Sequence, residues 1–362
     1  MKKIMITAVV ILTVLICGIF FISGQKGSAE QWKVGVILNG TKNDRNWTQS
    51  HYEGLEATAK ELNLEMMYYE RVPETEECYH IMEDMIEAGC RIIICNSFNY
   101  GSYISELAQE YPKICFFHAS GVNEAKNLST YFGRMYQMRY LSGMVAGLQT
   151  ENNQIGYVAA FPISEVNRGI NAFTLGVKSV NPDAVVHVEW CDSWTDDKAA
   201  GDATRELILN YQIDVLAMHT DSLRPLQIAE EEGIWSIGYN MDNSKRCEDT
   251  FLTAPVWNWE KFYIPRIKEC QQGKFIGRNY WQGAESGMIS LSPMTEHVKD
   301  GIKEHVYQKM EEISSGTFDV FYGPIYDREG RLRIPAGESM SDDAMLNEFD
   351  WYVEGVEIHG EE

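Results

Sequence analysis

Residues 33–95 read KVGVILNGTKNDRNWTQSHYEGLEATAKELNLEMMYYERVPETEECYHIMEDMIEAGCRIIIC, and the architecture of the chain follows from them. Short apolar runs at 34–38, 64–69 and 91–95 alternate with helical patterns at 47–62 and 74–88. This alternation is typical of βαβ units, in which helices connect the parallel strands of one sheet. The stretch therefore predicts an α/β lobe built on a mostly parallel sheet.

The same pattern continues along the rest of the chain and predicts a second lobe. Further strands are expected at 114–118, 154–159, 185–190, 215–219, 235–237 and 251–254. Further helices are expected at 103–110, 134–149, 167–180, 199–210, 223–232, 257–271 and 294–314. We expect an N-terminal lobe over 30–150, completed by about 273–315, and a C-terminal lobe over 151–272, completed by part of 316–362.

Residues 1–29 are expected to be a signal peptide or a membrane anchor. Lys2 and Lys3 precede the apolar run Ile4–Ser23, which is long enough for a spanning helix, and the positive-inside rule places the remainder outside the cytoplasm. The four residues ending at Cys17 resemble a lipidation motif, although the isoleucine before the cysteine departs from it. Three alternatives stay open: a lipid on Cys17, an uncleaved helix, and a signal cleaved after Ala29.

Composition and motifs exclude several classes of function. The chain of 362 residues has 31 basic and 53 acidic side chains, a net charge of −22, so we expect no nucleic-acid partner. The common hydrolase, zinc-protease and nucleotide-binding motifs are missing, so we expect neither an enzyme nor a cofactor. No two histidines have i, i+4 spacing on one helix and no CxxC pair occurs. The sequence therefore predicts neither a metal site nor a disulfide framework.

Aromatic and polar side chains gather where predicted strands end, which is where open α/β sheets bind small ligands. We interpret these side chains as the lining of a pocket, although Asp44 or Asn46 could instead cap the helix that follows them. The candidate ligand-binding residues are Asp44, Trp47, Thr48, Phe98, Asn167, Trp194, Asp242 and Trp257.

Six segments give the chain a resemblance to a known family. They are DRNWTQSHYEGLE (44–56), YQMRYLSGMVAG (136–147), NRGINAFTLGVKSVNP (167–182), IGYNMD (237–242), YGPIYD (322–327) and FDWYVEGV (349–356). In order and spacing they resemble the basic membrane protein family of bacterial solute-binding lipoproteins, which includes purine-nucleoside receptors of ABC importers. The resemblance implies a two-lobed periplasmic-binding-protein fold of type I, with a ligand cleft between the lobes and closure about a hinge. It also implies ABC permease and ATPase subunits as partners, and a location on the outer face of the cytoplasmic membrane.

The resemblance also assigns roles to individual residues. Nucleoside-binding relatives carry a motif close to D-x-S-F-N-Q, which Asp44 and Trp47 match, while Thr48 replaces its Asn. Trp194 is similar to a second stacking ring, and Asp242 to an acidic residue at the ligand edge. Trp257 and the residue after it replace a basic residue near the ribose, which favours a free base over a nucleoside.

The sequence thus predicts a receptor for a purine base or nucleoside-like heterocycle. Trp47, Trp194 and Phe98 are expected to stack on the ligand, and Asp44, Asn167 and Asp242 to bind its edge. The alternatives are a membrane-tethered ligand sensor without a transport role, a receptor for another flat solute such as a flavin, and an exported enzyme acting on nucleosides.

Overall fold

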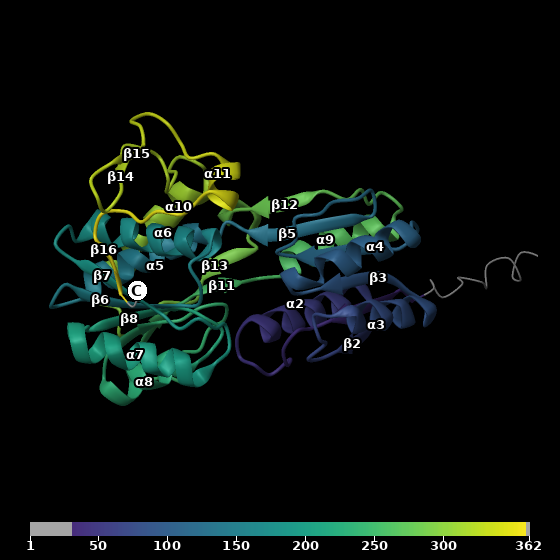
Figure 1. Ribbon diagram of the computed structural model, residues 1–362, viewed down its shortest axis with the longest axis horizontal. Helices are drawn as coiled ribbons and strands as arrows, with labels where there is room; N and C mark the ends of the chain where they lie inside the picture. Colours follow the sequence, from purple (N-terminus) through teal and green to yellow (C-terminus); the bar gives the residue numbers. More distant parts are fainter. Residues whose placement is uncertain (1–30, 360–362) are drawn as a thin grey trace, which may run out of the picture.

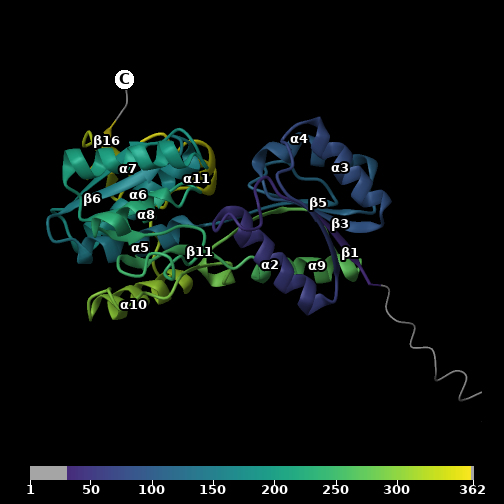
Figure 2. The same ribbon diagram turned by 90° about the horizontal axis from the view of Figure 1, so that it is seen from below.

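The computed structural model describes residues 31–359, and they form two α/β lobes side by side (Figures 1 and 2). Each lobe is built on a six-stranded sheet, and two further two-stranded sheets lie in the described part of the chain. The expected α/β class with two lobes, each on a parallel sheet flanked by helices, is confirmed.

The N-terminal sheet is parallel throughout, in the order β12-β5-β4-β3-β1-β2. Its strands are β1 (Lys33–Ile37), β2 (Glu65–Tyr69), β3 (Cys90–Cys95), β4 (Cys115–Ala119), β5 (Leu128–Gly133) and β12 (Asn279–Gln282). Its helices are α2 (Trp47–Leu62), α3 (Glu76–Glu87), α4 (Gly101–Glu110) and α9 (Glu260–Gln271), with η1 (Phe98–Tyr100) before α4. Both faces of β3 are buried: Ile92 and Ile94 join the core under α2 and α9, and Ile93 joins the core under α3 and α4. This two-sided burial explains the continuous apolar run of β3.

The C-terminal sheet is also parallel, in the order β10-β9-β8-β6-β7-β16. Its strands are β6 (Gln154–Ala159), β7 (Val185–Trp190), β8 (Val215–His219), β9 (Trp235–Ile237), β10 (Phe251–Thr253) and β16 (Val356–His359). The helices of this lobe are α5 (Tyr136–Gln149), α6 (Ser164–Val180), α7 (Asp197–Tyr211), α8 (Arg224–Glu232), α10 (Ile302–Ser314) and α11 (Asp342–Asn347). Helices α5 and α6 approach closely because Gly143 has no side chain; a Cβ there would lie 2.0 Å from the Phe173 carbonyl oxygen.

Three helices lie in a different lobe from the one that the expected boundaries give them. Helix α5, within the expected N-terminal range 30–150, packs on α6, and α10 packs on α5. Helix α9, within the expected C-terminal range 151–272, packs on α2. The N-terminal sheet is completed by β12, at 279–282, and the C-terminal sheet by β16.

The chain crosses between the lobes three times: after β5, before α9, and after β12 (Figures 1 and 2). The second and third crossings are joined by an antiparallel ribbon of β11 (Pro255–Trp257) and β13 (Ile289–Leu291), with η2 (Ala284–Ser286) before β13. The first crossing touches this ribbon at Gly133, where an added Cβ would lie 2.6 Å from the Trp257 ring and 2.7 Å from Ile289. Three connecting segments thus meet at one point, which is the natural position for a hinge.

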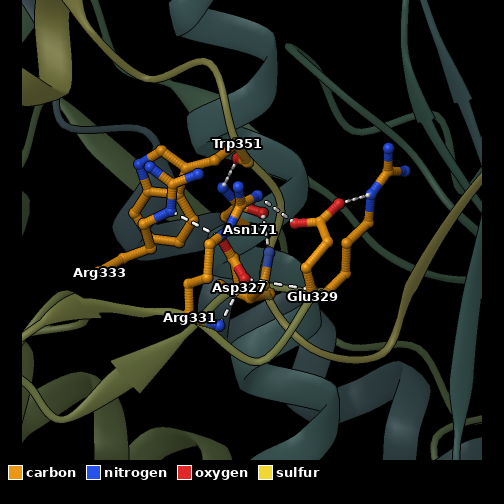
Figure 3. Close-up of polar contacts among 8 residues, drawn as sticks. Asn171, Asp327, Glu329, Arg331, Arg333 and Trp351 are labelled. Carbon is orange, nitrogen blue, oxygen red and sulfur yellow. Dashed lines mark hydrogen bonds and ion pairs between the residues drawn. The ribbon is translucent and has the colours of Figure 1, made fainter.

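Buried polar groups order the hairpin of the C-terminal segment and attach the segment to α6 of the C-terminal lobe (Figure 3). In the hairpin of β14 (Ile325–Tyr326) and β15 (Leu332–Ile334), the Asp327 carboxylate accepts hydrogen bonds from Arg331 Nε at 2.9 Å and Arg333 Nε at 2.7 Å. Nearby, the Asn171 amide of α6 donates to the Trp351 carbonyl oxygen at 2.7 Å and accepts from the Val353 amide at 2.9 Å. These contacts fix the path that leads to β16.

No helix within residues 31–359 is long and apolar enough to span a bilayer. The expected anchor at 1–29, including Cys17, lies outside the described residues. The cysteines of the described part have free thiols. Cys90 and Cys95 are buried in β3 as packing residues.

Candidate functional site

The carboxyl ends of the two sheets meet at a set of three polar contacts. Asn46, in the loop between β1 and α2, donates from Nδ2 to the carbonyl oxygen of Thr220, 3.4 Å away. Asn240, which follows β9, donates from its own Nδ2 to Asn46 Oδ1 at 2.5 Å and to Asp221 Oδ1 at 2.8 Å. Because Thr220 and Asp221 follow β8, these contacts join strand ends of both lobes, which is where this class of sheet binds ligands.

Four rings from the N-terminal lobe and the hinge form an aromatic cluster beside this contact. Trp257 stacks on Trp259 with ring centroids 4.4 Å apart, and Trp259 stacks on His51 at 4.1 Å. Trp47 meets all three rings edge to face, at centroid distances of 4.4 to 5.9 Å. The Trp47 Nε1 donates to the Asn96 carbonyl oxygen at 2.8 Å, so the ring is held in one orientation while remaining half-buried.

Trp194 supplies a half-buried ring from the C-terminal lobe. Its centroid lies 6.0 Å from Phe161 and 6.2 Å from His219. The Thr220 hydroxyl donates to the Trp194 carbonyl oxygen at 2.7 Å. Since the Thr220 carbonyl oxygen accepts from Asn46, the residue before Trp47, the two predicted stacking tryptophans flank one contact from opposite lobes.

Asp44 acts as a helix cap in the structure. Its Oδ1 accepts from the backbone N–H groups of Asn46 and Gln49, and its Oδ2 accepts from that of Thr48, each at 2.9 Å. The bonds to Thr48 and Gln49 provide acceptors for backbone N–H groups in the first turn of α2, which have no partner within the helix. Thr48 is itself buried, and its hydroxyl donates to Asn39 Oδ1 at 3.3 Å. The capping alternative therefore accounts for Asp44. Asp44 and Thr48 together stabilise the loop that carries Trp47.

The side chain of Asn167 forms hydrogen bonds with the C-terminal segment, so it is not available to bind the edge of a ligand. Its Nδ2 donates to the Phe349 carbonyl oxygen and its Oδ1 accepts from the Tyr352 hydroxyl, both at 2.9 Å. The residue is 4% exposed. The sequence could not reveal this because the partners lie 182 and 185 positions away.

The other three predicted residues differ in their surroundings. Phe98 is 56% exposed in η1. Asp242 is exposed, and its Oδ1 accepts from the Ser244 amide at 2.9 Å within its own loop. Trp257 is 6% exposed, and its Nε1 donates to Asn240 Oδ1 at 2.8 Å, so it links Asn240 to the aromatic cluster. Contact of any of them with a ligand stays a prediction.

Sequence reasoning missed Asp221. Burial, with the nearby charges of Asp44 and Glu165, raises the pKa of its carboxyl well above the usual range. A carboxylate in such a place gains from any partner that donates hydrogen bonds to it. Asp221 comes two residues after β8, so the strand-end rule that found the other residues would have found it too.

A buried charged cluster lies beside the end of β8, next to Thr220 and Asp221. Arg139 is 1% exposed, donates from Nη1 to the Met218 carbonyl oxygen at 2.7 Å, and places its guanidinium 3.9 Å from the centroid of the Tyr239 ring. The His219 ring bonds Tyr157 through Nδ1 at 3.1 Å and Glu165 through Nε2 at 3.2 Å. Burial, reinforced by the charge of Arg139, lowers the pKa of His219 to about 4.

This lowered pKa predicts a loss of stability in acid. Between pH 6.5 and about 4 the unfolded chain binds a proton at His219 that the folded chain does not, so stability falls as the pH drops through this window. From pH 7 to pH 5 the loss from this group is about 2 kcal/mol. Urea unfolding at both pH values should show a smaller pH dependence in His219→Gln than in the wild type.

His80→Gln is the matched control, because His80 is largely exposed and should leave the pH dependence unchanged. Part of the dependence is expected to remain in His219→Gln, since burial also lowers the pKa of His51 and His118. An unchanged pH dependence in His219→Gln would contradict the assignment.

A pocket of about 240 Å³ lies next to the contact between the lobes. Its lining is Arg45, Leu223, Leu226, Gln227, Asn243, Lys245, Arg246 and Cys247. None of the eight predicted residues lines this pocket, and it contains no aromatic ring. We therefore place the candidate site at the tryptophans and Asp221 rather than in this pocket.

The fold has two parallel-sheet lobes joined by three crossings, and aromatic and acidic groups lie at the facing strand ends. These features define the class of the protein, a solute-binding protein of the periplasmic-binding-protein type. Residues 31–320 match the family described as "ABC transporter substrate-binding protein PnrA-like", and the chain belongs to that family. The resemblance seen in the sequence is thereby confirmed. As ABC transporter substrate-binding proteins, members of this family work outside the cytoplasm and bind a small-molecule ligand for a transporter.

Similar proteins are named for different functions. A purine-binding protein of Brucella abortus is 34% identical, over 93% of this chain and 96% of the relative. A protein of Haloferax volcanii, named as a candidate ABC transporter glucose-binding protein, is 33% identical over 87% of this chain and 77% of the relative. The crystal structure of a transcriptional activator from Bacillus halodurans covers 79% of this chain and 99% of its own, with a TM-score of 0.71 and 23% identity, a likeness of fold alone.

Proposed function

We propose that this protein is the extracytoplasmic receptor of an ABC importer for a purine base or a nucleoside-like heterocycle. The observation that carries the proposal is the pair of half-buried tryptophans, Trp47 and Trp194, which flank the contact between the two lobes. The name of the Brucella relative adds independent support.

Stacking accounts for the class of ligand. A flat heterocycle between two indole rings gains on the order of 1 to 3 kcal/mol per stacked base, whatever the groups on its edge. The orientation of Trp47 is fixed in advance by its bond to the Asn96 carbonyl oxygen and by the rings around it, so little side-chain entropy is lost on binding. Hinge motion about Gly133 and the β11–β13 ribbon would bring the lobe carrying Trp194 onto the exposed face of the ligand.

Asp221 accounts for recognition of the ligand edge. The Asn240 amide already bonds Asp221 Oδ1, Asn46 Oδ1 and Trp257 Nε1, so this amide is fully used by the protein. Burial and two like charges raise the pKa of Asp221 although Asn240 donates a hydrogen bond to it, so a ligand that donates further hydrogen bonds would stabilise its charged form. The exocyclic amino group of a purine such as adenine would supply these hydrogen bonds. We therefore assign edge recognition to Asp221 in place of Asp44 and Asn167.

Asp221→Asn tests this assignment. Loss of a charge-assisted hydrogen bond costs about 1.5 to 3 kcal/mol, so adenine affinity is expected to fall on the order of 10- to 100-fold. Affinity for unsubstituted purine, which lacks the amino group, should change much less. Calorimetric titration of both ligands measures the difference.

Asp192→Asn is the matched control, because Asp192 is exposed at the end of β7 and should leave both affinities unchanged. An equal loss for adenine and unsubstituted purine in Asp221→Asn would contradict edge recognition by this carboxylate.

Glucose is the second candidate ligand, favoured by the name of the Haloferax relative. A sugar can lie against an aromatic face, but its hydroxyls require several polar partners around the ring. At the strand ends described above, the amides of Asn46 and Asn240 already bond one another. This arrangement favours a heterocycle over a sugar.

A sensor without a transport role and an exported enzyme are the remaining alternatives. We propose that neither applies, and that ABC permease and ATPase subunits are the partners. Deleting the permease gene should abolish uptake of the ligand while leaving its binding to this protein intact. Uptake that persists without the permease would favour the sensor, and a new product after incubation with nucleosides would reveal an enzyme.

We also propose that residues 1–29 tether the protein to the outer face of the cytoplasmic membrane. The intact mass of the protein recovered from membranes distinguishes the three alternatives for this segment. A mass that corresponds to a lipid on Cys17 supports a lipoprotein, and the uncleaved mass supports a helical anchor. Release of the protein into the medium with a new terminus after Ala29 would contradict tethering.

A further inference from the structure

The edge of the C-terminal sheet carries a cluster of two histidines and one glutamate on β7 and β16. Strands β7 and β16 are parallel neighbours, with His187 in register with Glu357 and Glu189 in register with His359. His187 Nδ1 lies 3.1 Å from His359 Nε2 and 3.4 Å from Glu357 Oε2. One potential ligand atom of each of these three residues lies within 4.8 Å of the others.

The orientation of the two imidazoles is fixed by surrounding residues. Tyr211, at the end of α7, stacks on His187 at 4.4 Å and on His359 at 4.1 Å between ring centroids. His187 Nε2 donates to Gln154 Oε1 at 2.7 Å. With its proton on Nε2, His187 keeps the lone pair of Nδ1 directed to the other two groups. A second hydrogen bond that sets the tautomer in this way is the usual support of a metal-binding histidine.

We propose that His187, Glu357 and His359 bind a divalent transition-metal ion, with Zn²⁺ as the best match. Tetrahedral zinc with bonds of about 2.0 to 2.1 Å separates its ligand atoms by about 3.3 Å. Two of the three separations, 3.1 and 3.4 Å from His187 Nδ1, are close to this value, and the third, between His359 and Glu357, lies within 4.8 Å. Two imidazoles and one carboxylate leave a fourth position for water. Imidazole ligands favour zinc, copper and nickel over magnesium and calcium.

The surroundings favour both access and binding. Glu357 and His359 lie on the edge strand and line an open depression of about 560 Å³, so an ion reaches them from solvent. The negative charge of Glu357, whose Oε2 lies 3.4 Å from His187 Nδ1, attracts a cation to the cluster.

The sequence rule for metal sites could not detect this cluster. That rule asks for two histidines on one helix or a close pair of cysteines, whereas His187 and His359 are 172 residues apart. They meet only because β16 joins the sheet beside β7. A bound ion would therefore cross-link the final strand to the sheet and stabilise the C-terminal segment, independently of ligand binding between the lobes.

The experiment is a Zn²⁺ titration of the full chain, purified in detergent without a histidine tag, with calorimetric detection. We expect one ion per chain, a rise in the unfolding temperature on adding Zn²⁺, and at least a 10-fold loss of affinity in His359→Gln. His305→Gln is the matched control, because His305 is exposed on α10. His359 sits at the end of an edge strand, so its replacement should leave the fold intact.

A Co²⁺ titration supplies a second readout. Visible absorption bands of four-coordinate Co²⁺ should appear in the wild type and be lost in both Glu357→Gln and His359→Gln. Absence of Zn²⁺ binding in the wild type, or equal affinity in wild type and His359→Gln, would overturn the proposal. Purine binding, measured in the same samples, should be unchanged in both variants.

Discussion

Replacing Trp47 with alanine is expected to weaken the binding of every purine by a similar factor, on the order of 10- to 100-fold. The reason is that stacking contributes about 1 to 3 kcal/mol and does not depend on the groups at the edge of the base. The order of preference among adenine, guanine and hypoxanthine should therefore be preserved. Calorimetric titration of the three bases measures both the factor and the order.

Trp47→Phe is the control that separates stacking from packing. It keeps an aromatic face but loses the Nε1 bond to the Asn96 carbonyl oxygen. We expect it to retain most of the affinity that alanine loses. If phenylalanine and alanine weaken binding equally, Trp47 acts through its cluster with His51 and Trp259 and not by stacking on the ligand.

Replacing Asn171 with alanine is expected to lower the free energy of unfolding by about 2 to 6 kcal/mol. The side chain is fully buried and satisfies both the Trp351 carbonyl oxygen and the Val353 amide (Figure 3). Alanine leaves two buried backbone groups without a partner, at a cost of about 1 to 3 kcal/mol each. Urea unfolding followed by fluorescence measures the loss.

Asn347→Ala provides the comparison, because the Asn347 side chain is exposed and bonds only Asp343 on the same helix. We expect a change within about 0.5 kcal/mol there. A similarly small change in Asn171→Ala would show that the C-terminal segment contributes little to the stability of the fold.

Local periodicity predicted most elements of this fold, but it missed the strands β5 and β12 and did not show the lobe to which each helix belongs. The apolar run of β3 marks a strand buried on two faces, and the repeats of α2 and α3 mark helices, because these signals depend only on neighbouring residues. Helix α5 lies on α6 because Gly143 and Gly176 allow backbone contact, and no spacing within α5 reveals that partner. The same limit applies to α9 and α10, which return to lobes begun far earlier in the chain.

Only part of the candidate site could be predicted from the sequence, because the rest depends on contacts between residues that are distant in the chain. The strand-end rule located Trp47 and Trp194 because it depends on the topology of a parallel sheet, which the sequence pattern does indicate. It could not separate a free side chain from one with a distant partner. Asn167 bonds the C-terminal segment, and only the fold brings these residues together. Asp44 caps α2 through local bonds, an alternative that the sequence had left open.

The most direct test of the proposed function is equilibrium binding of a ligand panel to the wild-type full chain. The panel consists of adenine, guanine, hypoxanthine, their nucleosides, riboflavin and glucose, each measured by titration calorimetry and by thermal unfolding. A ligand at 100 times its dissociation constant stabilises the folded state by about 2.7 kcal/mol, which gives a readable shift. We predict that purines bind, with free bases at least as tight as nucleosides. Binding of glucose alone would contradict a receptor built on stacking between Trp47 and Trp194, and binding of riboflavin with no shift from any purine would contradict a purine receptor.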